Sequence, residues 1–160
     1  MSPELTQQLF ISCQMTASDS ITLEQNQFKS IQAKAHPFCM VCGQSNPFGL
    51  GVKFVCEEDG SVATTFLGHP ALEGFQGFLH GGMIASLLDG AMTNCLFAHG
   101  CVALTGEIKI RYREPVQIGE EMSVRARIKH SLPPLHLLTA ELKQGNRVKA
   151  TATAKFMERD

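Results

Sequence analysis

Residues 79–104 contain no Lys, Arg or Glu, which is unusual for a segment of this length in a folded protein. Apolar side chains recur there at the three- and four-residue spacing of one helix face, which predicts a helix over residues 81–99 that stops at Gly100. These side chains are Met83, Ile84, Leu87, Leu88, Ala91, Met92 and Cys95. An acidic residue at the centre of a bilayer costs about 2.5–3.5 kcal/mol, so Asp89 argues against a membrane span. The segment therefore predicts a helix buried inside a folded domain.

Most of the chain after residue 50 is patterned as strands. Residues 51–58 and 61–67 flank the turn Glu58-Asp59-Gly60, which predicts a hairpin. Further along, apolar and polar side chains alternate, which predicts strands with one buried and one solvated face. The apolar members are Ile108, Ile110 and Tyr112, then Met122, Val124, Ala126 and Ile128, then Val148, Ala150, Ala152, Ala154 and Phe156. Residues 135–142 form a more continuous apolar strand. One helix that covers an antiparallel sheet is an α+β fold.

The N-terminal part of the chain has a different character. Residues 1–35 lack glycine and strand alternation, and Leu5, Leu9, Phe10 and Met15 suggest a short amphipathic helix before a second one over residues 21–35. The composition changes at His36-Pro37. We therefore divide the chain into a helical extension, residues 1–36, that packs on the domain or on a partner subunit, and a folded domain, residues 37–160.

Charge and cysteine content narrow the class of protein. Fourteen basic and fifteen acidic residues leave a net charge of -1, which argues against a basic nucleic-acid binder or a polybasic membrane adaptor. The start of the chain has neither the basic nor the apolar region of a signal peptide. We therefore expect a soluble cytoplasmic protein whose six cysteines are reduced, with no nucleic-acid or membrane partner.

Two parts of the predicted helix could carry chemistry. Its polar stripe consists of Ser86, Asp89 and Thr93, and a carboxylate in apolar surroundings is a functional candidate, although it could also lie on a partly exposed stripe. At the helix start, Gly81 and Gly82 follow His80, and free N–H groups there can stabilise charge on a carbonyl oxygen. The glycine pair could instead serve close helix packing.

The spacing of these two parts predicts an oligomer. His80 and Asp89 are nine residues apart, which corresponds to roughly 13–14 Å along a helix and about half a turn of rotation. Asp89 of one chain therefore cannot easily reach the glycines of the same chain. If the two parts cooperate, the site is built across a dimer interface.

Three segments carry a family resemblance: residues 78–89 with their His-Gly-Gly…Asp pattern, the loop at 38–50, and residues 105–115. They resemble the hotdog-fold acyl-CoA thioesterase superfamily, of the phenylacetic-acid-pathway and human thioesterase-superfamily-member type. The resemblance covers about residues 37–156 and implies a long central helix wrapped by a curved antiparallel sheet, in homodimers that often pair into tetramers. It also implies hydrolysis of an acyl-CoA without metal or cofactor.

The resemblance assigns roles position by position. It implies that Asp89 is the general base or nucleophile, that Gly81 or Gly82 of the other subunit supplies the oxyanion N–H, and that His80 orients the turn or lies near the thioester. Thr105 would hydrogen-bond the attacking water or Asp89. Some members carry Asn six residues before the His, where this chain has Gly74. The nearest amide that could replace it is Gln76.

Other residues of the sequence are candidates for binding the substrate or a metal. Arg111 and Arg113 lie among the basic residues of the predicted strands and can match the phosphates of coenzyme A, so we place them with Gln76 and Ser86 as substrate-binding candidates. The pair Cys39-x-x-Cys42, with His36 and Cys56 nearby, lacks the second close pair of a typical zinc site. We therefore interpret it as a structural loop and expect no metal.

Two alternatives to the thioesterase remain open. A hotdog enoyl-thioester hydratase would require a His–acid pair on one substrate, for which His80 and Asp89 are poorly spaced within one chain. A non-catalytic acyl-CoA-binding hotdog module would require the pocket but not Asp89.

Overall fold

A computed structural model describes residues 17–158, so the helix suggested by Leu5, Leu9, Phe10 and Met15 lies outside the described part. The described chain contains two α-helices, one 3-10 turn and six strands. In chain order these are α2 (Ala17–Ala35), β1 (Val55–Cys56), β2 (Val62–Leu67), the turn Pro70–Leu72, α3 (Gly81–Ala98), β3 (Ala103–Tyr112), β4 (Glu121–Leu132), β5 (Leu135–Gln144) and β6 (Arg147–Glu158).

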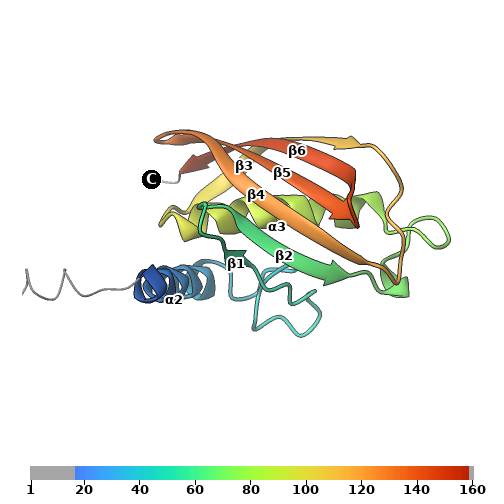
Figure 1. The fold of residues 1–160 in the computed structure, drawn as a ribbon, viewed down its shortest axis with the longest axis horizontal. Helices are drawn as coiled ribbons and strands as arrows, with labels where there is room; N and C mark the ends of the chain where they lie inside the picture. The colour runs from blue at the N-terminus through green and yellow to red at the C-terminus, as the bar shows by residue number, and fades with distance from the viewer. Residues whose placement is uncertain (1–16, 159–160) are drawn as a thin grey trace, which may run out of the picture.

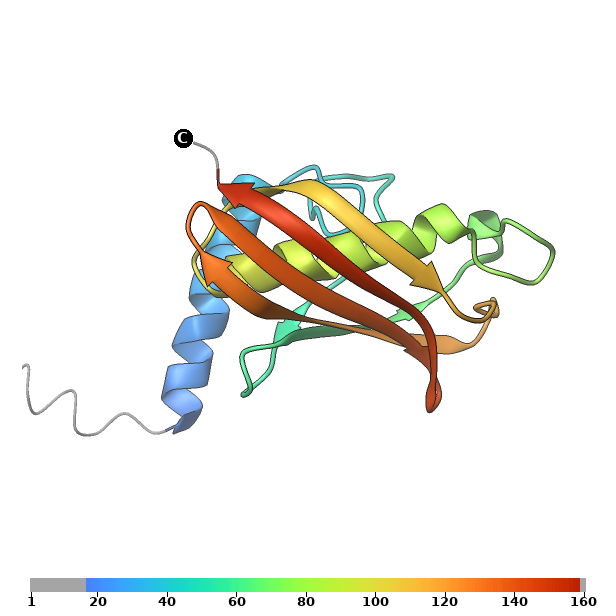
Figure 2. The same ribbon diagram turned by 90° about the horizontal axis from the view of Figure 1, so that it is seen from above.

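The strands form one sheet in the order β1-β2-β4-β5-β6-β3, and every neighbouring pair is antiparallel. Figure 1 shows the sheet curving around α3. Figure 2, which is a view from above, shows the same helix beneath the strands. This confirms the predicted α+β fold, a long helix wrapped by a curved antiparallel sheet.

Helix α3 is buried because almost all of its side chains are apolar. Leu87, Leu88, Met92 and Leu96 are all fully buried, and burial of each such side chain contributes about 1.5–3 kcal/mol. Gly100 ends the helix with a φ of 76°, a left-handed conformation that glycine adopts at little cost. Among the described residues, no helix combines the length and the apolar character that a bilayer crossing requires.

The expected strand over residues 51–58 is largely absent, because the backbone at its start hydrogen-bonds to the preceding loop and not to a strand. The Leu50 N–H donates to Met40 and the Val52 N–H donates to Val41, so this backbone is held by the preceding loop. Only Val55–Cys56 pairs with β2.

The predicted buried face of β3, formed by Ile108, Ile110 and Tyr112, is only partly buried in the single chain. Ile110 is half-buried against the core, whereas Ile108 and Tyr112 on the same face are 36% and 52% exposed, respectively. They are exposed because β3 is the outermost strand of the sheet, with β6 as its one neighbour among the described strands. An edge strand with exposed apolar side chains is a surface on which a second strand can pair.

Helix α2 packs against the C-terminal half of α3. Phe28 is 1% exposed, and the Gln32 side-chain amide donates to Asn94 of α3 at 2.7 Å. Just after α2, the ring of His36 makes an edge contact with Phe97 of α3, with ring centroids 4.9 Å apart. The helix predicted over residues 21–35 is therefore present and joined to the core, and it starts at Ala17.

Candidate functional site

The start of α3 is organised by His80. This residue is extended, with φ -60° and ψ 136°, and its Nδ1 accepts a hydrogen bond from the Gly82 N–H at 2.9 Å. The neutral imidazole therefore carries its proton on Nε2. A Cβ at position 82 would lie only 3.0 Å from His80 Nδ1, so a larger residue would crowd this cap. One of the two predicted oxyanion donors, the Gly82 N–H, is thus already occupied.

Gly81 keeps its N–H available while its carbonyl is held. The Tyr112 hydroxyl at the end of β3 donates to the Gly81 carbonyl at 3.0 Å. Within residues 17–158, the Gly81 N–H has no hydrogen-bond partner. The helix start is therefore fixed to β3 and presents one free donor. Sequence reasoning missed Tyr112, and the available signal was its identity as the chain's single tyrosine.

The structure explains why position 74 is glycine here. A Cβ at Gly74 would lie 3.1 Å from both the Cα and the Cδ2 of His80. A larger side chain at position 74 would therefore press against the residue that caps α3. The amide of Gln76 lies in the same loop, and its side chain is exposed.

Asp89 is held in position by a hydrogen bond from a residue of β3. The Thr105 hydroxyl donates to Asp89 Oδ1 at 2.7 Å. No hydrogen-bond partner for the other carboxylate oxygen is found in the described part of the chain. Asp89 is half-buried and Thr105 is exposed, so the carboxylate opens onto the side of the molecule where β3 forms the sheet edge.

A β-bulge brings Thr105 to Asp89. The register of β3 against β6 shifts between Thr105 and Glu107, so that Thr105 pairs with Phe156 and Glu107 with Lys155. Paired residues share a face of the sheet, and Phe156 is buried while Lys155 is exposed. Thr105 therefore points toward α3, on the same face as Ile108 and Tyr112, although simple alternation from these residues would turn it outward.

His36 lies in the electrostatic field of Asp89. Burial lowers the pKa of the His36 imidazole, and the negative charge of Asp89 partly opposes that shift. A neutral imidazole therefore lies on the α2 side of the candidate base. Its position after α2, far from Asp89 in the sequence, left no sequence signal for this proximity.

The two halves of the site remain apart within one chain. Gly81 and Asp89 are eight residues apart on a continuous helix, which corresponds to about 12 Å of rise. Among the substrate-binding candidates, the Ser86 hydroxyl donates to the Gly82 carbonyl at 2.9 Å. The side chains of Gln76, Arg111 and Arg113 are exposed and make no hydrogen bond or ion pair with any other described residue. The structure thus joins Asp89 to Thr105 and His80 to the glycines, but not these two groups to each other.

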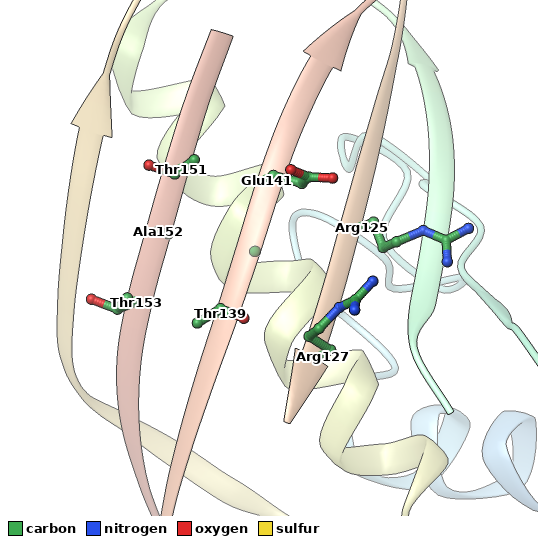
Figure 3. A pocket seen from close by; sticks show the side chains of 8 residues that line it. Arg125, Arg127, Thr139, Glu141, Thr151, Ala152 and Thr153 are labelled. Carbon is green, nitrogen blue, oxygen red and sulfur yellow. The ribbon is translucent and has the colours of Figure 1, made fainter. Parts of the chain in front are cut away.

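A shallow hollow of about 460 Å³ lies on the outer face of β4, β5 and β6 (Figure 3). It is lined by Arg125, Arg127 and the threonines of β5 and β6. Arg125 lies 3.5 Å from Asp59 and 3.7 Å from Glu57. This arginine is therefore engaged by the β1–β2 turn, whereas Arg111 and Arg113 remain available to an anionic ligand.

The fold and these groups define a class of protein. One long helix lies in a curved antiparallel sheet, with a carboxylate at mid-helix and a glycine turn at the helix start. This is the hotdog arrangement. Residues 76–151 match the family model described as the thioesterase superfamily. This match confirms the resemblance seen in the sequence over residues 76–151.

Individual known proteins agree with this class. Acyl-coenzyme A thioesterase THEM4 of Mus musculus is 32% identical over 73 residues, which are 44% of this chain and 31% of that protein. The match thus spans about a third of this curated relative. A phenylacetic acid degradation-related protein from Ralstonia eutropha JMP134 is 25% identical, with a TM-score of 0.67 over 82% of this chain and 99% of that one. A Streptococcus mutans protein solved with acetyl CoA is 22% identical, with a TM-score of 0.64 over 68% of this chain and 88% of that one.

Proposed function

We propose that this chain is an acyl-CoA thioesterase that hydrolyses an acyl-CoA to the free acid and coenzyme A. The observation that carries the proposal is the half-buried Asp89, which Thr105 holds by one oxygen while the other stays open. The name of the mouse relative and the acetyl CoA bound to the Streptococcus mutans protein support the substrate class.

We place the complete site between two protomers. A second copy that pairs along the exposed edge of β3 covers Leu104, Ile108 and Tyr112. A two-fold axis at that edge brings Asp89 of one protomer toward Gly81 of the other. The rise of about 12 Å between Gly81 and Asp89 on one helix is then no obstacle, because each site takes these two residues from different helices. Pairing of such dimers into tetramers fits the same proposal.

The chemistry needs three groups. The Asp89 carboxylate accepts a proton from water, and the resulting hydroxide attacks the thioester carbonyl. The N–H of Gly81 from the other protomer donates to the oxyanion that forms. When the tetrahedral intermediate collapses, the C–S bond breaks, and coenzyme A leaves as a thiolate that takes up the proton from Asp89. Thr105 keeps the carboxylate in position by donating to the oxygen that does not take the proton.

The exposed basic side chains complete the proposal for substrate binding. Arg111 and Arg113 lie on and just after β3, at the same edge as Asp89, and neither is paired with a described acidic residue. Guanidinium groups match phosphate oxygens in pairs, so we assign these two to the phosphates of coenzyme A. Gln76 and Ser86 then flank the acyl end.

A direct assay tests the function. Loss of the thioester absorbance is followed over a panel of short, long and aromatic acyl-CoAs, because thiol reagents would also react with the cysteines of the protein. We expect saturable turnover on at least one class of acyl chain. Binding without turnover across the panel would favour the acyl-CoA-binding module, and hydration of an enoyl-CoA without hydrolysis would favour the hydratase.

A complementation experiment tests the shared site. One protomer carries Asp89→Asn and lacks the base, and the other carries Gly81→Pro and lacks the donor N–H. Each homodimer is expected to be inactive, whereas a mixed dimer contains one intact site. Random mixing of the two variants should therefore restore about a quarter of wild-type activity. If the site lay within one protomer, co-refolding would restore nothing, and a monomeric mass at assay concentration would contradict the proposal as well.

A further inference from the structure

Two thiols and an imidazole lie close together where α2 ends and the following loop begins. The ligand atoms of His36, Cys39 and Cys42 all lie within 4.8 Å of one another, and His36 Nδ1 is 3.9 Å from Cys42 Sγ. Around a tetrahedral zinc ion with Zn–S near 2.3 Å and Zn–N near 2.0–2.1 Å, neighbouring ligand atoms are roughly 3.5–3.8 Å apart. The three ligand atoms therefore need only a small contraction to bind one ion.

Each sulfur already receives an N–H donor. The Val41 N–H donates to Cys39 Sγ at 3.4 Å, and the Asn94 side-chain amide donates to Cys42 Sγ at 3.4 Å. Asn94 is itself oriented, since Gln32 donates to its Oδ1 at 2.7 Å. Donors aimed at a thiolate stabilise its charge, and such outer partners typically orient metal ligands.

The backbone of the loop holds the two cysteines side by side. The Gly43 N–H donates to the Cys39 carbonyl at 2.9 Å. A Cβ at position 43 would lie 2.3 Å from the Cys39 nitrogen, so only glycine permits this closure. The ligand geometry is thus part of the fold of the loop.

A second cluster of metal-binding residue types differs from the first in the hydrogen bonds of its histidine. Cys101, His136 and Glu158 also lie within 4.8 Å of one another. In that cluster, His136 is already bonded on both nitrogens, by Ser131 at 2.8 Å and by Glu158 at 2.9 Å. A metal would have to replace a short hydrogen bond of a buried imidazole. At His36, by contrast, the one partner of Nδ1 within residues 17–158 is the Cys42 sulfur at 3.9 Å.

We propose that His36, Cys39 and Cys42 bind a zinc ion. Soft thiolate ligands with an imidazole select zinc over magnesium or calcium. A cavity of about 780 Å³ lined by His36, Cys42, Gln32 and Phe54 adjoins the cluster and gives space for a water molecule as the fourth ligand. The ion would connect the end of α2 to the loop that packs on α3, near the junction seen in Figure 1. From the sequence we interpreted this loop as structural because the cysteine pair lacked a second close pair, and His36 is the third ligand that the fold supplies.

Titration with metal alone tests the site. The reduced full-length chain is stripped with a chelator and titrated with Co²⁺, whose thiolate charge-transfer and visible bands report tetrahedral sulfur coordination. We expect one ion per chain, displaced by Zn²⁺, and a higher Tm when Zn²⁺ is bound. Cys39→Ser and His36→Gln should each weaken Zn²⁺ binding by roughly 100-fold or more, since loss of outer partners alone costs about 10–100-fold.

Cys101→Ser is the matched control, because it removes a thiol from the other cluster. It should keep the cobalt spectrum and the zinc-dependent rise in Tm. Circular dichroism of the metal-free Cys39→Ser variant verifies that the loss is not due to unfolding. Absence of thiolate bands in wild type, or equal binding in wild type, Cys39→Ser and His36→Gln, would overturn the proposal, as would loss of binding in Cys101→Ser alone. None of these readouts depends on thioesterase activity.

Discussion

Asp89→Asn is expected to lower kcat/KM for acyl-CoA hydrolysis by about 10²–10⁴-fold, the usual contribution of a general base. The amide has nearly the same size as the carboxylate and can still accept the hydrogen bond from Thr105, so the fold should be retained. It cannot accept a proton from water. The measurement is direct thioester absorbance on the best substrate of the panel, together with a thermal unfolding curve.

The matched control for this variant is Glu141→Gln. It makes the same carboxylate-to-amide change on β5, where Glu141 pairs with Lys143 at 2.6 Å on the outer side of the sheet. Its activity should stay close to wild type. Because Gly90 follows the altered position, mass spectrometry should verify that the new amide has not been hydrolysed. Unchanged turnover in a verified Asp89→Asn sample would remove Asp89 from the mechanism.

Gly81→Pro should lower kcat/KM by about 10²–10³-fold, the effect of losing one oxyanion donor. Proline removes the N–H and adds a ring, and it is tolerated at the first position of a helix. The preceding residue must be extended, and His80 already has φ -60° and ψ 136°. The variant should therefore fold, which thermal unfolding can verify, while kcat falls.

Gly81→Ala separates the donor from the added bulk. It keeps the N–H, and its Cβ would make ordinary contacts of 3.7 Å with the Tyr112 ring. We expect it to retain most of the activity. If Gly81→Pro and Gly81→Ala lose the same activity, the Gly81 N–H is not the oxyanion donor.

The fold was predictable because its patterns are long and local. The absence of Lys, Arg and Glu over residues 79–104 identifies a buried helix, and α3 occupies Gly81–Ala98. The alternation in β4 and β6 follows the burial found in the structure. The expected strand over residues 51–58 was wrong because its backbone bonds to the loop before it. A single sequence does not show such a competing partner.

The site was predictable only in part. Asp89 and the glycine turn stand out because each departs from its helical surroundings. The contacts of Tyr112 with Gly81 and of His36 with Cys42 depend on tertiary packing between distant segments. The exposure of Ile108 on β3 was mispredicted because alternation shows that a strand has two faces, and not whether a neighbour covers them.

The bulge in β3 limits how this sequence can diverge. If the strand lost the bulge but kept Gly106, Thr105 would turn away from α3, while every residue from Glu107 onward kept its face. Deletion of Gly106 would instead restore regular pairing with Thr105 still opposite Phe156. A short polar side chain could replace Thr105 and still donate to Asp89. Relatives can therefore exchange the residue type at position 105, and they can lose the bulge only together with one residue of the strand.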